Sequence, residues 1–200
     1  MRPITEVAEE LGLDRESVIP YGHFKAKIEL SAIKKGGRRG KMVVVTGITP
    51  TPAGEGKTTT TVGLTQSLGR LGKKVVATLR EPSLGPIFGI KGGGTGGGKS
   101  LIQPEDEVNI HFTGDAHAVA SAHNLLAALT DNAAQRGQVD GFRPEGMTWR
   151  RVMDVEDRAI RSIIAGVGGS NNAPLRETGF AIVAASEIMA ILALSRDLEN

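Results

Sequence analysis

One stretch of the chain combines residue types that bind phosphate. Residues 51–58 read Thr-Pro-Ala-Gly-Glu-Gly-Lys-Thr and lie between an apolar run and a segment that favours a helix. Glycine lets a phosphate approach the main chain, and the N–H groups at a helix N-terminus attract anions. We therefore predict that the phosphates of ATP are bound by Thr51, Pro52, Ala53, Gly54, Glu55, Gly56, Lys57 and Thr58.

Two of these side chains have specific expected roles. Lys57 is predicted to contact the β- and γ-phosphates as a catalytic residue, and the Thr58 hydroxyl is predicted to face Mg²⁺. The full phosphate-binding pattern has a glycine where this chain has Thr51. A simple Gly-Lys turn is the alternative interpretation, and the predicted strand before the loop and helix after it favour the nucleotide.

The elements around the loop predict the fold class: an α/β protein with a P-loop NTPase-like parallel sheet flanked by helices. Residues 41–46 are nearly all apolar, as in a strand that is covered on both faces. Residues 57–71 have helical spacing, and residues 75–79 predict a second strand, parallel to the first. We divide the chain into an N-terminal helical segment, residues 1–40, and a nucleotide-binding domain, residues 41–200.

Arg80 and Glu81 follow directly after the second predicted strand. Ligands of open parallel sheets bind beyond the carboxyl ends of the strands, so we expect both residues near the loop, with Arg80 as a second catalytic residue. The alternative for Arg80 is an ordinary surface ion pair. The glycine run of residues 92–98 satisfies a dinucleotide pattern, but no strand leads into it. We interpret it as a loop that either orders over a ligand or is simply flexible.

Hydrophobic periodicity predicts further helices and strands. The expected helices are 3–13, 14–18, 24–35, 116–134, 154–165 and 184–194, the last apolar on most sides and hence buried. The expected strands are 108–112 and 180–183. His117 and His123 are six residues apart and lie on different helix faces, so a zinc site is not expected.

Composition narrows the class of protein. The 200 residues are 40% hydrophobic and 23% charged, which is ordinary for a globular domain. A net charge of +2 and 4% aromatic residues give no support to a nucleic-acid partner. The absence of cysteine excludes disulfides and thiol chemistry. No apolar stretch approaches a membrane span and no signal peptide opens the chain, so we expect no membrane partner and a cytoplasmic location.

Several long strings together resemble the formate–tetrahydrofolate ligase family. They are residues 49–60 around the loop, Arg80-Glu-Pro-Ser-Leu-Gly-Pro86, Phe88-Gly-Ile-Lys91, His111-Phe-Thr-Gly-Asp115, Asn124-Leu-Leu-Ala-Ala128 and Ala185-Ser-Glu-Ile-Met-Ala-Ile191. The strings occur in family order, and a threonine at position 51 is itself the family's habit. Family members are much longer than this chain, so the resemblance covers their N-terminal part and predicts a truncated sheet.

The resemblance implies an enzyme that uses ATP to join formate to tetrahydrofolate, giving 10-formyltetrahydrofolate, ADP and phosphate through formyl phosphate. It implies ATP and Mg²⁺ as cofactors, small-molecule substrates and a homotetramer, and it assigns formate and formyl phosphate to Arg80 and Glu81. Formate and the γ-phosphate are both anions and repel each other, so we expect cations already positioned in the site to bring them together. The alternatives are another P-loop ATP-dependent ligase, a partitioning-type ATPase, and a nucleotide-binding fragment that lacks the folate site and is inactive alone.

Overall fold

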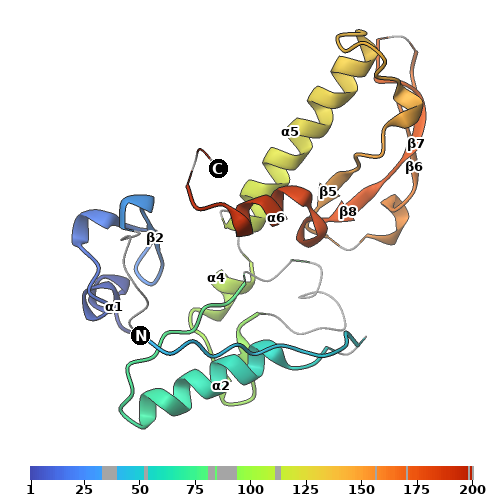
Figure 1. Ribbon diagram of the computed structural model, residues 1–200. Coiled ribbons are helices and arrows are strands. Elements are labelled where there is room, and N and C mark those ends of the chain that lie inside the picture. The colour runs from blue at the N-terminus through green and yellow to red at the C-terminus, as the bar shows by residue number, and fades with distance from the viewer. Residues whose placement is uncertain are drawn as a thin grey trace.

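The computed structural model describes residues 1–32, 40–51, 54–80, 84, 94–110, 114–155, 157–169, 171–197 and 199. Its elements form separate groups along the chain, with α1 and β2 in one, α2 in a second, and α5 with β5 to β8 in a third (Figure 1). In these ranges, no helix is long and apolar enough to cross a bilayer.

The N-terminal group consists of short elements that pack on one another. They are α1 (Ile4–Glu10), the 3-10 turn η1 (Arg15–Ser17), the strands β1 (Val18–Pro20) and β2 (Ala26–Ile28), and the turn η2 (Leu30–Ala32). The two strands pair antiparallel, with Ile19 opposite Lys27, and α1 contacts β1. Lys25 Nζ lies 2.7 Å from Glu107 Oε2, and this ion pair connects the N-terminal group to the middle of the chain.

The middle group is organised around one helix. Its elements are α2 (Lys57–Arg70), the strands β3 (Gly96–Gly97) and β4 (Ser100–Leu101), and α4 (Glu105–Asn109). The β3–β4 hairpin packs on α2, and Gln66 Nε2 of the helix donates a hydrogen bond to the Leu101 carbonyl at 3.0 Å.

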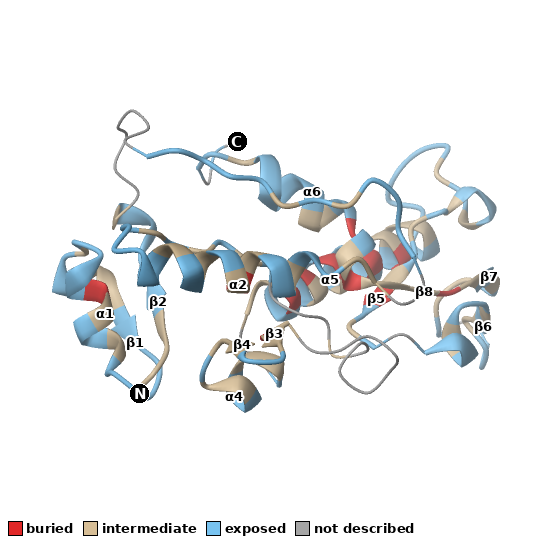
Figure 2. Ribbon diagram, turned by 90° about the horizontal axis from the view of Figure 1, so that it is seen from below, coloured by how far each residue is buried: buried red, intermediate tan, exposed pale blue. Residues whose placement is uncertain are grey.

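The C-terminal group contains a small hydrophobic core. Its elements are α5 (Asp115–Gln135), η3 (Pro144–Gly146), β5 (Arg151–Met153), η4 (Arg158–Ile160), β6 (Ile163–Ala165), β7 (Arg176–Thr178), β8 (Phe180–Ile182), η5 (Val183–Ala185) and α6 (Glu187–Leu194). Strands β5 and β8 are parallel, and β6 and β7 form an antiparallel pair between them in the chain. The core joins Ala116 and Val119 of α5 to Val152 and Val183, and Figure 2 shows buried residues gathered along α5 and β5.

The expected parallel pair on either side of the loop is not formed in the described residues. Residues 41–46 and 75–79 have no strand partner, and Val43 and Val44 are 66% and 72% exposed. Parallel strands are stable when both of their faces are covered, and nothing in the described chain covers these side chains. The chain is a mixed α/β protein whose small parallel pair, β5–β8, lies elsewhere.

Three further predictions are wrong where the structure describes them. Residues 26–28 of the expected helix 24–35 form β2, because they pair with β1. Residues 108–112 were predicted to form a strand, but residues 108 and 109 are the end of helix α4. Three acidic residues in the first turn of α4 favour this helix. In the expected helix 154–165, only η4 is helical, and residues 163–165 pair with β7. Residues 33–35 and 111–112 lie outside the described chain.

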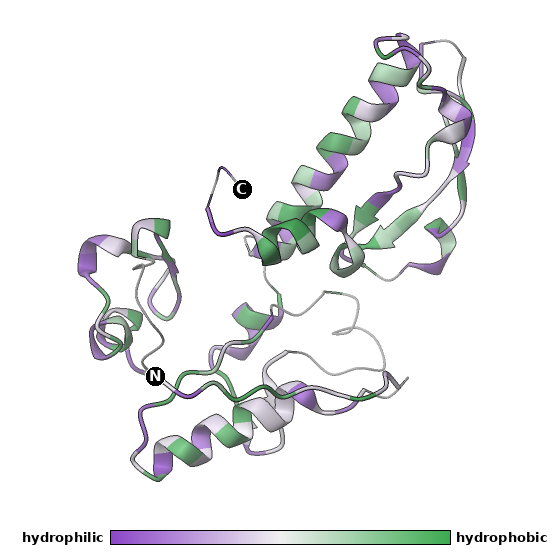
Figure 3. Cartoon of the chain, in the orientation of Figure 1, coloured by the Kyte–Doolittle hydropathy of each residue, from purple (hydrophilic) through white to green (hydrophobic). Residues whose placement is uncertain are grey.

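The long helical predictions are confirmed. Residues 57–70 form α2 and residues 115–135 form α5. Strand β8 and helix α6 also lie where they were predicted. However, α6 is not buried: Figure 3 shows it as strongly hydrophobic, and Leu194 is 81% exposed. Only its inner side contacts α5, through Ile188 and Met189.

Candidate functional site

The predicted phosphate-binding loop leads directly into α2. Gly56 is the N-cap residue and has a φ of +68°, a left-handed conformation that glycine adopts readily. The first helical hydrogen bond runs from the Thr60 N–H to the Gly56 carbonyl at 2.9 Å. The N–H groups of Lys57, Thr58 and Thr59 precede that bond, so they have no helical carbonyl to bind. Together with the positive end of the helix dipole, these donors favour an anion.

The side chain of Glu55 folds back onto the loop. Its Oε1 atom accepts a hydrogen bond from the Thr51 N–H, and its Oε2 atom pairs with the Lys57 ammonium. The bond to Lys57, followed by that to Thr51, lowers the pKa of Glu55 from 4.5 to about 2, so the carboxylate is ionised at neutral pH. The Glu55 side chain is only 16% exposed, whereas that of Lys57 is 47% exposed.

Gly47 lies against these two side chains and was not singled out by the sequence analysis. A Cβ atom at this position would lie 3.3 Å from Glu55 Cγ and 3.5 Å from Lys57 Nζ. The Gly54 N–H donates to the Thr51 carbonyl at 3.1 Å, which closes the loop behind them. The available signal was a glycine between the apolar run and the loop, where close backbone approach is common.

The second half of the glycine run forms a β-hairpin with residues 100 and 101. Gly97 approaches α2 so closely that an added Cβ would lie 3.4 Å from both Thr59 Cγ2 and Thr59 Oγ1. Thr95, before β3, is buried and donates a hydrogen bond to Glu105 Oε1 at 3.1 Å. Residues 94–98 therefore pack on the first turns of α2, and their ordering over a ligand remains a prediction. Residues 92 and 93 lie outside the described chain.

Arg80 is exposed at the end of the segment that follows α2. Within the part of the chain that the structure describes, no hydrogen bond or ion pair joins Arg80 to the loop. The structure therefore brings together Thr51, Glu55 and Lys57, and the predicted role of Arg80 remains a prediction. Pro52, Ala53 and Glu81 lie outside the described residues, so their predicted roles remain predictions.

Asp154 was not singled out by the sequence analysis, because its position was interpreted as the start of a helix. It follows β5 directly, and its Oδ2 atom accepts a hydrogen bond from the Leu84 N–H at 3.2 Å. Its Oδ1 atom is buried without a hydrogen-bond partner among the described residues. Leu84 belongs to the family-like string that begins at Arg80, so a carboxylate oxygen at a carboxyl strand end lies beside that string.

His123 is buried in a polar network that joins α5 to α6. Its Nε2–H donates to the Arg150 carbonyl at 2.8 Å, so Nδ1 accepts the Ser186 hydroxyl hydrogen at 2.8 Å. Ser186 Oγ also accepts the Ile188 N–H at 3.0 Å and so caps α6. The Trp149 ring stacks on the His123 ring, with their centroids 4.7 Å apart. Both ring nitrogens of His123 therefore have hydrogen-bond partners.

A second buried network surrounds Asp131, near the end of α5. Arg151 Nη2 donates to Asp131 Oδ2 at 2.8 Å, and Arg176 Nη2 donates to Asp131 Oδ1. The Arg176 side chain is 8% exposed, and its Nε and Nη1 atoms have no partner among the described residues. This cluster fastens the end of α5 to β5 and β7, and nothing in it suggests chemistry.

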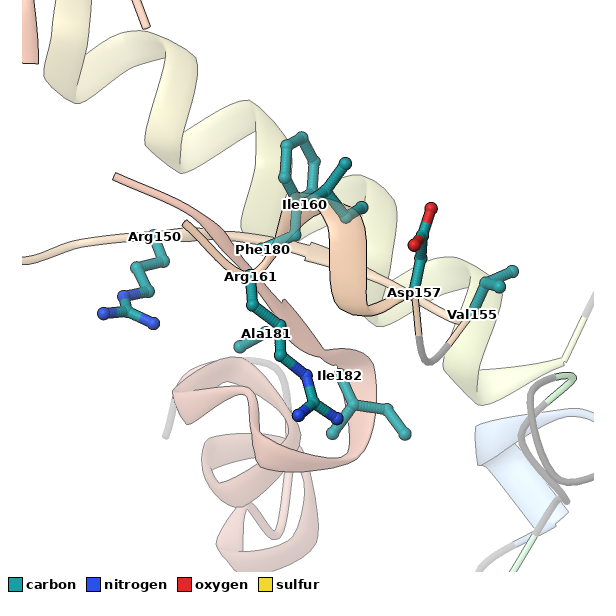
Figure 4. A pocket seen from close by; sticks show the side chains of 8 residues that line it. All are labelled: Arg150, Val155, Asp157, Ile160, Arg161, Phe180, Ala181 and Ile182. Atoms are coloured by element: carbon teal, nitrogen blue, oxygen red, sulfur yellow. The ribbon is translucent and has the colours of Figure 1, made fainter. Parts of the chain in front are cut away.

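A hollow of about 280 Å³ lies beside β5 and β8 (Figure 4). Its lining is mostly apolar with three charged side chains: Arg150, Val155, Asp157, Ile160, Arg161, Phe180, Ala181 and Ile182. Figure 4 shows the Arg150 and Arg161 side chains extending in different directions, and Asp157 is occupied by the Ala159 N–H at 2.8 Å. The polar groups do not converge as they do in most specific ligand sites.

No group of three or more His, Cys, Asp or Glu side chains forms a metal cluster within the described ranges. The loop residues and the elements above define a general class: an α/β protein with a Gly-Lys-Thr loop at the start of a helix. Comparison with known families is more specific, because residues 1–200 match formate–tetrahydrofolate ligase. The chain belongs to the formate–tetrahydrofolate ligase family.

Curated relatives agree with this assignment. The chain is 55% identical to a formate–tetrahydrofolate ligase of Thermotoga petrophila, over 100% of this chain and 37% of the relative. It is also 55% identical to the Bartonella tribocorum enzyme of that name, over 98% of this chain and 36% of the relative, and 54% identical to that of Thermotoga maritima. The chain thus spans little more than a third of the length of these relatives.

Proposed function

We propose that this chain supplies the ATP-binding part of an enzyme that ligates formate to tetrahydrofolate. The observation that carries the proposal is the left-handed Gly56, which starts α2 at Lys57 and leaves three N–H groups without helical partners. Family membership supplies the reaction: formate attacks the γ-phosphate to give formyl phosphate and ADP, and an amine of tetrahydrofolate then attacks the formyl carbon and releases phosphate.

Lys57 and the first N–H groups of α2 bind the β- and γ-phosphates in this proposal. The N–H groups are already placed at the start of α2, whereas the Lys57 ammonium exchanges the Glu55 carboxylate for the phosphates when they bind. Thr58 directly follows Lys57 in the chain, and its hydroxyl makes no hydrogen bond among the described residues. Oxygen donors of this kind suit Mg²⁺, which when bound would neutralise charge on the phosphates.

Arg80 and Glu81 are proposed to hold formate and formyl phosphate. The support is the family-like string that they begin and the lack of any carboxylate partner for Arg80 in the described residues. A guanidinium without an ion-pair partner is available to an anionic substrate.

Folate binding is proposed to need parts of the enzyme beyond this chain. A pterin ring needs an apolar slot, usually with an aromatic face. Trp149 already stacks on His123, and Tyr21 has the ammonium groups of Lys25 and Lys27 within 5.8 Å of its ring centre. A nucleotide-binding fragment that is inactive alone is therefore a second candidate, and the 37% coverage of the Thermotoga relative favours it. A homotetramer and a cytoplasmic location remain predictions.

The decisive experiment is calorimetric titration of Mg-ATP into the native chain and a Lys57→Ala variant. We expect the substitution to weaken ATP binding strongly, because it removes the cation that faces the phosphates. Lys73→Ala, which removes an exposed lysine just after α2, is the matched control and should bind ATP normally. Equal affinity of the native and Lys57→Ala chains would refute the assignment.

A further inference from the structure

The loop of this chain already holds an anion. One oxygen of the Glu55 carboxylate accepts a hydrogen bond from the Thr51 N–H, and the other pairs with the Lys57 ammonium. A phosphate bound in this loop would use the same Lys57 ammonium and neighbouring N–H groups. Glu55 and a bound phosphate therefore compete for the same donors.

We propose that Glu55 is a specificity-determining residue of the loop: its carboxylate excludes small anions and yields only to a polyphosphate chain. The inference rests on the function proposed above. A triphosphate has further oxygens that reach the free N–H groups of α2 and a cation at Thr58, so it makes contacts for which Glu55 does not compete. Inorganic phosphate or formate is too small to make these additional contacts.

The surroundings of Glu55 support this role. Gly47 leaves room for the Glu55 and Lys57 side chains to lie against the backbone, and the carboxylate is ionised at neutral pH. A competitor attached to the loop acts at a high effective concentration, which for short flexible connections is on the order of millimolar. Weakly bound anions are displaced by such a competitor, whereas a ligand with several additional contacts is not. After phosphoryl transfer, the return of Glu55 would also help to expel phosphate.

The test is calorimetric measurement of dissociation constants for Mg-ATP, ADP and inorganic phosphate with the native chain, Glu55→Gln and Glu55→Asp. Glutamine removes the charge, and aspartate keeps it but shortens the side chain by one methylene. We expect both variants to bind phosphate roughly fivefold to tenfold more tightly, a range set by the loss of one charge-assisted hydrogen bond. ATP affinity should change less, so that the ratio of ATP to phosphate affinity falls. Glu6→Gln, an exposed acid on α1, controls for net charge.

The outcomes separate this inference from the proposed function. If both variants bind Mg-ATP, ADP and inorganic phosphate more weakly by the same factor, Glu55 determines the shape of the loop, and the inference is overturned. An unchanged ratio of affinities, with ATP binding that still depends on Lys57, would overturn it as well. The absence of Lys57-dependent ATP binding in the native chain and in both variants would overturn the phosphate site itself. If Glu55→Gln fails to fold by circular dichroism, the aspartate variant decides.

Discussion

Removal of the Asp131 carboxylate should destabilise the C-terminal group severely. Asp131 accepts hydrogen bonds from Arg151 and Arg176, and the Asp131 and Arg176 side chains are only 6% and 8% exposed. Two further nitrogens of Arg176 are buried and have no partner in the part of the chain that the structure describes, so Asp131→Ala would leave a buried guanidinium with no carboxylate. Breaking a buried pair in this way costs about 3–5 kcal/mol.

The assay is urea unfolding followed by the fluorescence of Trp149, the chain's single tryptophan, which stacks on His123 in the same group. We expect Asp131→Ala to lower the unfolding midpoint strongly, while Asp140→Ala, at an exposed site, leaves it unchanged. The double variant Asp131→Leu with Arg176→Met should recover part of the loss, because the buried Arg176 charge is removed together with Asp131 and the remaining Arg151 guanidinium, whose side chain is 29% exposed, can still reach water. A loss below about 1 kcal/mol for Asp131→Ala would refute the reasoning.

Three further predictions address the site and its supports. In a full-length family member with this N-terminal sequence, Arg80→Ala should leave ATP binding intact and slow formyl phosphate formation by about 10²–10³, the usual cost of one donor to a developing anion; lost ATP affinity at an unchanged rate would make Arg80 a nucleotide ligand. Gly96→Ala should open the β3–β4 hairpin, since the new Cβ would lie 2.2 Å from the Ser100 carbonyl oxygen. Opening of the hairpin should speed amide hydrogen exchange at Ile102, whose N–H donates to the Thr95 carbonyl, and the control Gly40→Ala should not change it. The 200-residue chain alone should bind Mg-ATP but form no 10-formyltetrahydrofolate, and saturable micromolar binding of tetrahydrofolate by this chain would contradict that expectation.

The helices were the most predictable part of this chain. A helix forms its hydrogen bonds within its own segment, so the spacing of apolar residues in 57–70 and 115–135 was sufficient to place α2 and α5. Short strands were less predictable, because each needs a partner from another part of the chain. Residues 163–165 read as the end of a helix but pair with residues 176–178, and a local pattern contains no information about that partner.

The sequence by itself determined the loop, the helix that it begins and the family, because these depend on residue types in one continuous order. Only the tertiary structure decided that Leu84 meets Asp154, that His123 meets Ser186, and that the glycine hairpin packs on α2. It also decided that residues 41–46 carry exposed valines rather than a buried strand. The physical reason is common to all of these: a contact between distant segments depends on which surfaces the whole fold brings together, and a parallel strand exists only where other segments cover both of its faces.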